Sequence, residues 1–153
     1  MNVYRKVFIY LSLLLNMKCG EIASRPPIVI TPDETLDKAV ELLATHDVGI
    51  LVVVDRNNPN KPVGVLSERD VVRALAWRAP LTVTVREVAT TTGLIYVYTD
   101  DPVELAAGKM VKHGIRHVLV LNKSGDLYGV ISQRDIVALY ATHKTPTPAH
   151  PSL

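Results

Sequence analysis

Two short stretches of the sequence carry the same polar residues in the same order. Residues 63–75 and 128–139 both contain Gly-Val-x-Ser-x-Arg-Asp, followed by an apolar run with helical spacing. The serine is a good N-cap for that helix, and the aspartate lies in its first turn. Backbone N–H groups and a hydroxyl at a helix start can bind phosphate, while a carboxylate can accept hydrogen bonds from ribose hydroxyls. The pattern therefore suits a nucleotide ligand.

A simpler interpretation exists for each single copy, in which the serine only caps the helix and the aspartate only complements its dipole. Two copies in matching contexts favour the ligand interpretation. Neither serine is a good nucleophile candidate, because no His–Asp relay accompanies it in the motif. The repeated residues are Gly64, Ser67, Arg69 and Asp70 in the first copy, and Gly129, Ser132, Arg134 and Asp135 in the second.

The composition is that of one ordinary domain with an aliphatic core. The 153 residues are 48% hydrophobic but only 5% aromatic, which favours buried strands covered by helices. A net charge of +2 without a basic stripe argues against nucleic-acid binding. A nucleotide hydrolase is disfavoured because the sequence has neither a P-loop nor a metal-binding carboxylate cluster.

The single cysteine, Cys19, excludes an intramolecular disulfide and any multi-cysteine metal site. A zinc site made of Cys19, His113 and His117 would have no recognised spacing. Nothing in the sequence requires an oxidising compartment, and we expect a cytoplasmic protein.

Hydrophobic periodicity predicts the same order of elements twice. The first half has a helical lead-in at 18–24, strands at 28–30, 50–54 and 63–66, a helix capped by Thr31 or Asp33 that ends at 47–49, a loop at 55–61 and a helix at 68–77. The second half has a lead-in at 85–90, strands at 94–98, 115–121 and 127–131, a turn at 122–126, and helices at 100–113 and 133–140. An internal duplication of this kind predicts two small sheets that bury a shared face about a pseudo-two-fold axis.

The predicted organisation has five parts. An extension at 1–16 is followed by repeats at 17–78 and 84–142, joined by a linker at 79–83, and by a Pro-rich tail at 143–153. Arg5-Lys6 and the apolar run after them are compatible with an extra helix, an upstream start codon or a signal peptide, but the run is too short to span a bilayer. The tail is expected to be extended or disordered.

These motifs resemble a tandem pair of CBS domains, also called a Bateman module. The resemblance is carried by the residues that begin at Ile28 and at His113 and by both copies of the Gly-Val-x-Ser-x-Arg-Asp motif, and it covers nearly the whole chain. It implies a mixed α/β fold of two β-α-β-β-α repeats with three-stranded sheets. It also implies a non-catalytic regulatory module that binds AMP, ADP or ATP, or S-adenosylmethionine, in two clefts between the repeats.

The resemblance also implies the residues of each cleft. Cleft A would use Val65, Leu66, Ser67, Arg69 and Asp70, facing Leu94, Ile95, Ile115, Arg116 and His117. Cleft B would use Val130, Ile131, Ser132, Arg134 and Asp135, facing Ala23, Ile28, Val48, Gly49 and Ile50. Arg69 and Arg134 have an equally good interpretation as partners in surface or inter-repeat ion pairs.

The two clefts are expected to differ, because Arg116-His117 in the second repeat aligns with Gly49-Ile50 in the first. A guanidinium can hold a phosphate in a bidentate fork, so cleft A is predicted to bind a charged nucleotide more tightly than cleft B. Alternatively, Arg116 lies near the pseudo-axis and serves both phosphates, or only a dimer interface.

The resemblance further implies an output through association, since two repeats use up nearly all of the chain. Ligand binding would change the relative orientation of the repeats and so the surface offered to a partner protein. A homodimer through the helices is expected, with candidate contact residues Val71, Val72, Leu75, Ile136, Val137 and Leu139. The alternative functions are a nucleic-acid-associated regulator and a sensor of S-adenosylmethionine.

Overall fold

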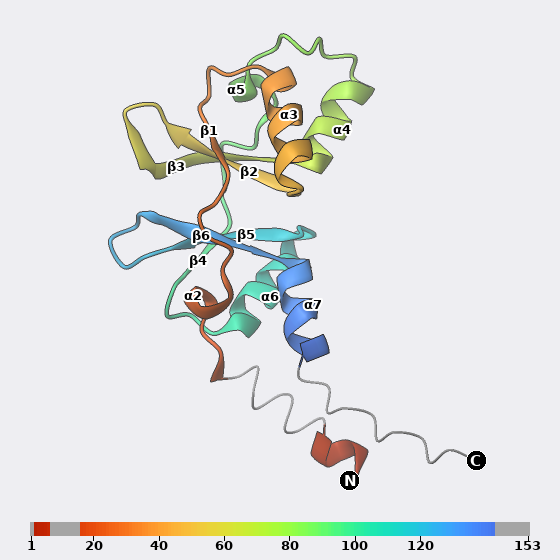
Figure 1. The fold of residues 1–153 in the computed structure, drawn as a ribbon, viewed down its shortest axis with the longest axis vertical. Coiled ribbons are helices and arrows are strands. Elements are labelled where there is room, and N and C mark those ends of the chain that lie inside the picture. Colours follow the sequence, from red (N-terminus) through yellow and green to blue (C-terminus); the bar gives the residue numbers. More distant parts are fainter. Residues whose placement is uncertain (1, 7–15, 143–153) are drawn as a thin grey trace, which may run out of the picture.

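Two three-stranded sheets lie face to face at the centre of the molecule, and the longer helices pack against their outer faces (Figure 1). This computed structural model describes residues 2–6 and 16–142. The predicted mixed fold with two repeats is confirmed. Most of the expected extension and all of the Pro-rich tail lie outside the described residues, and residues 3–6 form a helical turn.

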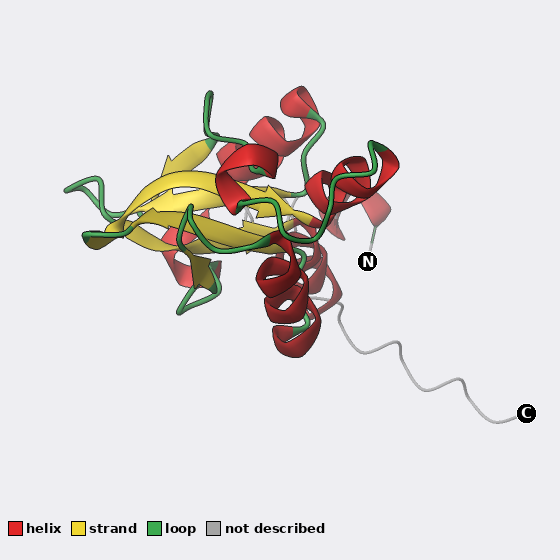
Figure 2. Ribbon diagram, turned by 90° about the horizontal axis from the view of Figure 1, so that it is seen from above, coloured by secondary structure: helices red, strands yellow, loops and turns green. Residues whose placement is uncertain are grey.

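Each repeat builds one sheet from a parallel and an antiparallel pair of strands. The first repeat contains β1 (Val29–Ile30), α3 (Leu36–His46), β2 (Ile50–Asp55), β3 (Asn58–Ser67) and α4 (Glu68–Ala76). The second contains β4 (Tyr96–Tyr98), α6 (Val103–His113), β5 (His117–Leu121), β6 (Leu127–Ser132) and α7 (Gln133–Thr142). In Figure 2, seen from above, the strands of the two sheets overlap, and most of the helices lie toward one end of them.

The central strands are buried on both faces, and alternate side chains serve different cores. Leu51 and Val53 of β2 belong to the core under α3, whereas Val52 and Val54 pack against Leu119 of the other sheet. Strand β2 therefore contributes one face to the core of its own repeat and the other face to the interface between the two sheets.

Two local predictions in the first repeat were wrong. The hydroxyl of Thr35, rather than that of Thr31 or the carboxylate of Asp33, caps α3 by accepting a hydrogen bond from the Lys38 N–H at 3.2 Å. The expected loop at 55–61 is mostly strand, because β3 begins at Asn58 and pairs with Asp55 through an irregular hairpin. Proline is tolerated there since β3 lies at an edge of its sheet.

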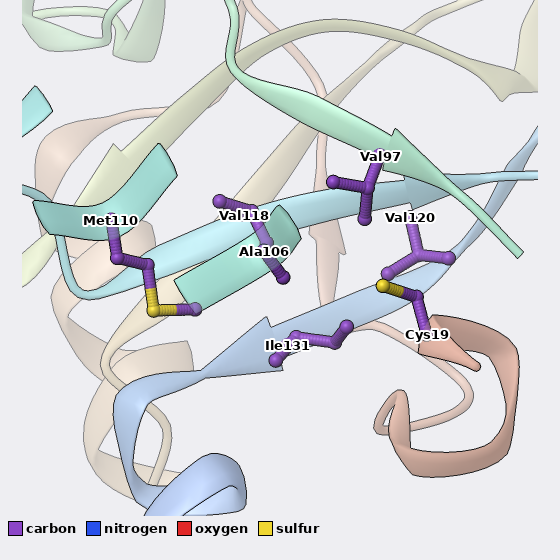
Figure 3. Close-up of a cluster of buried hydrophobic side chains, with 7 residues drawn as sticks. All are labelled: Cys19, Val97, Ala106, Met110, Val118, Val120 and Ile131. Carbon is purple, nitrogen blue, oxygen red and sulfur yellow. The ribbon is translucent and has the colours of Figure 1, made fainter. Parts of the chain in front are cut away.

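The lead-in helix of each repeat packs on the sheet of the other repeat. Helix α2 (Cys19–Ile22) contributes Cys19, which is fully buried beside Val120 and Ile131 of the second repeat (Figure 3). Helix α5 (Val85–Val88) likewise buries Val85 in the core of the first repeat. Our sequence analysis assigned each lead-in to its own repeat and missed this exchange.

The exchanged segments also make backbone contacts with the opposite repeat. The Ser24 N–H donates to the Val130 carbonyl at 2.8 Å, and the Thr90 N–H donates to the Val65 carbonyl at 2.9 Å. These two bridges are equivalent under the pseudo-two-fold relation. They place residues 24 and 90 directly beside the two repeated motifs.

Gly129 of β6 lies where this contact is tightest. A Cβ at Gly129 would be 2.6 Å from the Ser24 carbonyl oxygen, which is a backbone atom that cannot move cheaply. We expect Gly129→Ala to lower the free energy of unfolding by about 1–3 kcal/mol in urea denaturation.

The matched control is Gly108→Ala in α6, where a Cβ meets no atom within 4 Å. That change is expected to raise the free energy of unfolding by about 0.5–1 kcal/mol through helix propensity. Equal effects at the two glycines would contradict the contact at Ser24.

Candidate functional site

A cavity of about 440 Å³ opens between the two repeats. The motif of the second repeat lines one side of it, and the segment at 24–28 and the corner between α3 and β2 of the first repeat line the other. This is the predicted cleft B. The first repeat contributes Ser24, Pro26, Pro27, Ile28, Asp47, Val48, Gly49, Ile50 and Glu68 to its wall. The second repeat contributes Arg116, His117, Val130, Ser132, Gln133, Arg134 and Asp135.

Asp135 is held in this wall by the capping box of α7. The Ser132 N–H donates to Asp135 Oδ2 at 2.8 Å, and the Asp135 N–H donates to Ser132 Oγ at 3.1 Å. Within the described part of the chain, no hydrogen bond reaches the other carboxylate oxygen, Oδ1. A half-buried carboxylate with a fixed orientation and an available oxygen is well suited to accept hydrogen bonds from hydroxyl groups.

The equivalent aspartate at cleft A, Asp70, is more fully engaged. Its Oδ2 accepts from the Ser67 N–H at 2.9 Å and from the Ser67 hydroxyl at 3.0 Å. Its Oδ1 accepts from the Thr90 hydroxyl at 3.5 Å, and the residue is only 9% exposed. Both carboxylate oxygens of Asp70 therefore already have partners inside the protein.

Arg69 at cleft A is also engaged. Its Nη1 donates to the Gly114 carbonyl at 2.8 Å, and this hydrogen bond joins α4 to the end of α6 in the other repeat. The equivalent arginine, Arg134, lines the cavity of cleft B. Neither of the surface or inter-repeat ion pairs considered for these arginines is formed among the described residues.

The difference between the clefts begins at the exchanged segments. Thr90 and Ser24 are equivalent positions, since each forms the backbone bridge beside a motif. The Thr90 hydroxyl reaches Asp70, whereas Ser24 lines the cavity and makes no hydrogen bond with Asp135 in the described chain. The polar groups of cleft B therefore face an open cavity, whereas the equivalent polar groups of cleft A are hydrogen-bonded to one another.

Arg116 and His117 line cleft B, although our sequence analysis placed them in cleft A. Arg116 precedes β5 and His117 begins it, beside the equivalent corner of the first repeat, where a Cβ on Gly49 would lie 2.9 Å from the His117 ring. The Gln133 N–H donates to the Arg116 carbonyl at 2.8 Å, as the Glu68 N–H does to the Gly49 carbonyl at 3.0 Å.

His117 is surrounded by charged groups of the cavity. Burial lowers its pKa from the ordinary value of 6.5, and the Arg116 guanidinium acts in the same direction. The carboxylates of Glu68 and Asp135 act in the opposite direction on this pKa. The imidazole is therefore neutral at pH 7.

Some residues expected in cleft B point elsewhere because side chains alternate along extended backbone. Ile131 is fully buried in the core of the second repeat, whereas Val130, which was also predicted for cleft B, lines the cavity. Ala23 packs against that same core, so Ser24 takes its place in the wall. The predicted residues Ile28, Val48, Gly49 and Ile50 do line the cavity.

Several apolar residues expected in cleft A also belong to the cores. Leu66 is fully buried in the core of the first repeat. Ile95 and Ile115 pack against the core of the second repeat. Of the motif residues at cleft A, Ser67 and Asp70 are hydrogen-bonded to each other, and Arg69 is bonded to the Gly114 carbonyl.

Our sequence analysis missed six residues of the cavity wall. They are Ser24, Pro26, Pro27, Asp47, Glu68 and Gln133. Glu68 and Gln133 each follow the capping serine of a motif, so the repeated motif itself carried a signal for both. The prolines lie in the segment that connects α2 to β1. Hydrophobic periodicity does not predict where such a connecting segment lies in the folded protein.

Two further findings concern the described residues only. None of their helices is long and apolar enough to cross a membrane. No group of three or more His, Cys, Asp or Glu side chains among them is arranged to hold a metal ion.

Comparison with protein families and curated sequences shows where the chain belongs. The CBS domain family model matches twice, at residues 19–76 and 85–142. An uncharacterized 17.7 kDa protein of Acidianus ambivalens is 33% identical over 130 residues, which is 82% of this chain and 75% of the relative. The L-aspartate semialdehyde sulfurtransferase of Methanocaldococcus jannaschii is 30% identical over 81% of this chain, which spans only 23% of that enzyme.

Solved structures with the same fold include complexes with adenosine compounds. A CBS domain protein from Pyrobaculum aerophilum complexed with AMP has a TM-score of 0.74 and is 39% identical, with 82% of this chain and 99% of that chain covered. A CBS domain pair in complex with 5′-methylthioadenosine and S-adenosyl-L-methionine has a TM-score of 0.76 and is 29% identical, with coverages of 84% and 98%. With two family matches and one three-stranded sheet in each repeat, the chain belongs to the CBS domain family and is a tandem CBS pair.

Proposed function

We propose that the chain is a non-catalytic regulatory module that binds an adenosine nucleotide in cleft B. The observation that carries the proposal is the open cavity of about 440 Å³ in which Asp135 keeps one carboxylate oxygen available. That volume is within the range of ordinary small-molecule sites, roughly 300–1,000 Å³. The similar proteins whose structures hold AMP, or 5′-methylthioadenosine and S-adenosyl-L-methionine, support an adenosine ligand.

Each part of the ligand has suitable partners in the wall. Asp135 would accept hydrogen bonds from the ribose hydroxyls. The Ser132 hydroxyl and the Arg116 guanidinium would bind the 5′ phosphate. The apolar side chains of Ile28, Val48 and Ile50 would enclose the adenine faces. AMP, ADP and ATP share the adenosine part of this interaction.

This proposal reverses the predicted preference for cleft A. That preference depended on Arg116, which lines cleft B. A ligand in cleft A would have to displace Thr90 from Asp70 and compete with the hydrogen bond between Arg69 and Gly114. Breaking such internal hydrogen bonds costs free energy that binding at cleft B does not require.

A thermal-shift panel with AMP, ADP, ATP, NADH and S-adenosylmethionine tests the proposed function. A ligand at about 100 times its dissociation constant adds about 2.7 kcal/mol to the free energy of unfolding. Calorimetric titration of the best ligand should give one molecule per chain at the tighter site. If no adenosine compound raises the melting temperature, the proposed function is wrong although the fold stands.

The output would be conformational. Because both repeats supply the wall of cleft B, a bound ligand joins them and favours one relative orientation. A partner protein that contacts both repeats would then distinguish the bound from the free state. The cytoplasm is the proposed location, since the only cysteine is a buried free thiol that needs no oxidising compartment.

Self-association through the helices is part of the proposal. Of the six candidate contact residues, Val72, Leu75 and Val137 are 64%, 51% and 59% exposed. Val71 and Ile136 pack into the cores and are unavailable for a dimer.

We expect Leu75→Glu to convert a homodimer into monomers, because it places a charge in an apolar contact. Sedimentation velocity at several protein concentrations measures this. Asn60→Glu is the control, since Asn60 is exposed on the hairpin of β2 and β3, and that hairpin lies on the opposite side of the first repeat from α4 (Figure 1). A wild-type monomer at all concentrations, or equal effects of both changes, would contradict the helix interface.

A further inference from the structure

The cavity of cleft B carries both signs of charge in nearly equal number. Asp47, Glu68 and Asp135 are acidic, and Arg116 and Arg134 are basic. His117 adds no charge at pH 7, because burial lowers its pKa. If Asp135 binds the ribose, the two remaining carboxylates balance the two guanidinium groups. A cavity with this balance offers little net attraction for a ligand with several negative charges.

Glu68 is the carboxylate with the most informative position. It is the first residue of α4, and its own N–H is bonded to the Gly49 carbonyl at the corner of the cavity. Its Cδ would lie 3.8 Å from a Cβ built on Gly49, and the His117 ring touches that same point. The carboxylate of Glu68 therefore lies close to the His117 imidazole, whose pKa both Glu68 and Asp135 raise.

The equivalent position in the second repeat is occupied by Gln133, which has nearly the same shape and no charge. Gln133 also lines the cavity, and its N–H makes the equivalent hydrogen bond to the Arg116 carbonyl. Among the described residues, no salt bridge or hydrogen bond engages the carboxylate of Glu68. A carboxylate in the first turn of α4 is favourable for the helix dipole, and Glu68 in addition lies in the cavity wall with both carboxylate oxygens available.

We propose that Glu68 is a specificity-determining residue of cleft B, which favours adenosine ligands with at most one phosphate over those with a polyphosphate chain. This inference rests on the proposed binding of adenosine compounds at that site. One 5′ phosphate can pair with Arg116, which directly precedes His117 and the strand β5. Further phosphates add negative charge in a cavity where Glu68 faces them without a cation of its own, and like charges at such distances repel.

Calorimetric titrations of AMP and of ATP, both with EDTA to remove divalent cations, test the inference on the full chain. ATP carries roughly two more negative charges than AMP. The wild type should bind AMP more tightly than ATP. In Glu68→Gln, the ratio of the two affinities should fall by about fivefold to tenfold, mainly because ATP binds better.

Gln133→Glu is the matched opposite change, and it should raise the ratio by a similar factor. Both substitutions exchange residues that already occur at equivalent positions, so the fold tolerates either side chain there. The effect of Glu68 should also weaken in 0.5 M salt, where screening extends over only about 4 Å.

The results separate this inference from the proposed function. If neither AMP nor ATP binds, the proposed function fails. If both bind and the wild type prefers ATP, or if Glu68→Gln leaves the ratio unchanged, cleft B binds nucleotides but Glu68 does not select among them.

Discussion

Asp135→Ala is expected to lower the affinity for AMP by about tenfold to a hundredfold, whereas Asp70→Ala should leave it within about twofold. A hydrogen bond to a charged group contributes about 1.5–3 kcal/mol, which is the origin of the first figure. Asp135 has a carboxylate oxygen available in the cavity, but both oxygens of Asp70 are bonded to Ser67 and Thr90. Calorimetric titration of both variants measures the difference.

The effects of Asp135→Ala and Asp70→Ala on the free energy of unfolding should have the opposite order. Asp70 is 9% exposed and receives three hydrogen bonds, so its removal leaves Ser67 and Thr90 without their acceptor. We expect Asp70→Ala to lower the free energy of unfolding by about 1–3 kcal/mol, and by more than Asp135→Ala does. Equal losses of AMP affinity in the two variants would show that the clefts bind ligand alike.

The duplication made most of the fold predictable. Two copies of one order of strands and helices, each ending in the same capping motif, indicated two equal sheets around a shared interface. Local signals supported this order, as in the buried run at Ile50–Asp55 that became the central strand β2. Such signals depend on residues close together in the sequence, which is why they survive without knowledge of tertiary contacts.

The exchange of the lead-in helices could not be predicted in the same way. Cys19 and Val85 are small apolar residues on single helical turns, and either sheet could have buried them. The choice is made by long-range packing, such as the contact of Ser24 with Val130. Local sequence patterns do not predict a contact between residues so far apart in the sequence.

The candidate site was predicted in part, and its errors have two physical causes. Successive side chains of a strand point to opposite faces, so only one of the two predicted neighbours Val130 and Ile131 lines the cavity. Near a pseudo-two-fold axis, equivalent residues of both repeats lie close together, so assigning Arg116 to one cleft required the three-dimensional structure. The motif aspartates were found correctly, but the role of Thr90 in bonding Asp70 was not visible.

Arg116→Ala is expected to lower the affinity for AMP by about tenfold or more while leaving the affinity for adenosine unchanged. Arg116 is exposed in the cavity wall, and among the described residues no hydrogen bond or salt bridge engages its guanidinium. It is therefore available for a phosphate, and a bidentate pair of this kind is stronger than an ordinary hydrogen bond. Titrating each variant with AMP and with adenosine isolates the contribution of the phosphate.

Arg69→Ala is the matched control for this experiment. Its guanidinium donates to the Gly114 carbonyl at cleft A, so its loss should cost some stability without changing AMP binding at cleft B. If Arg116→Ala weakened AMP and adenosine equally, Arg116 would act by shaping the start of β5 rather than by binding phosphate. If Arg69→Ala weakened AMP more than Arg116→Ala did, the phosphate would lie in cleft A. The difference between Gly49 and Arg116 would then affect only the backbone shape before β2 and β5, and it would not decide which cleft binds the nucleotide.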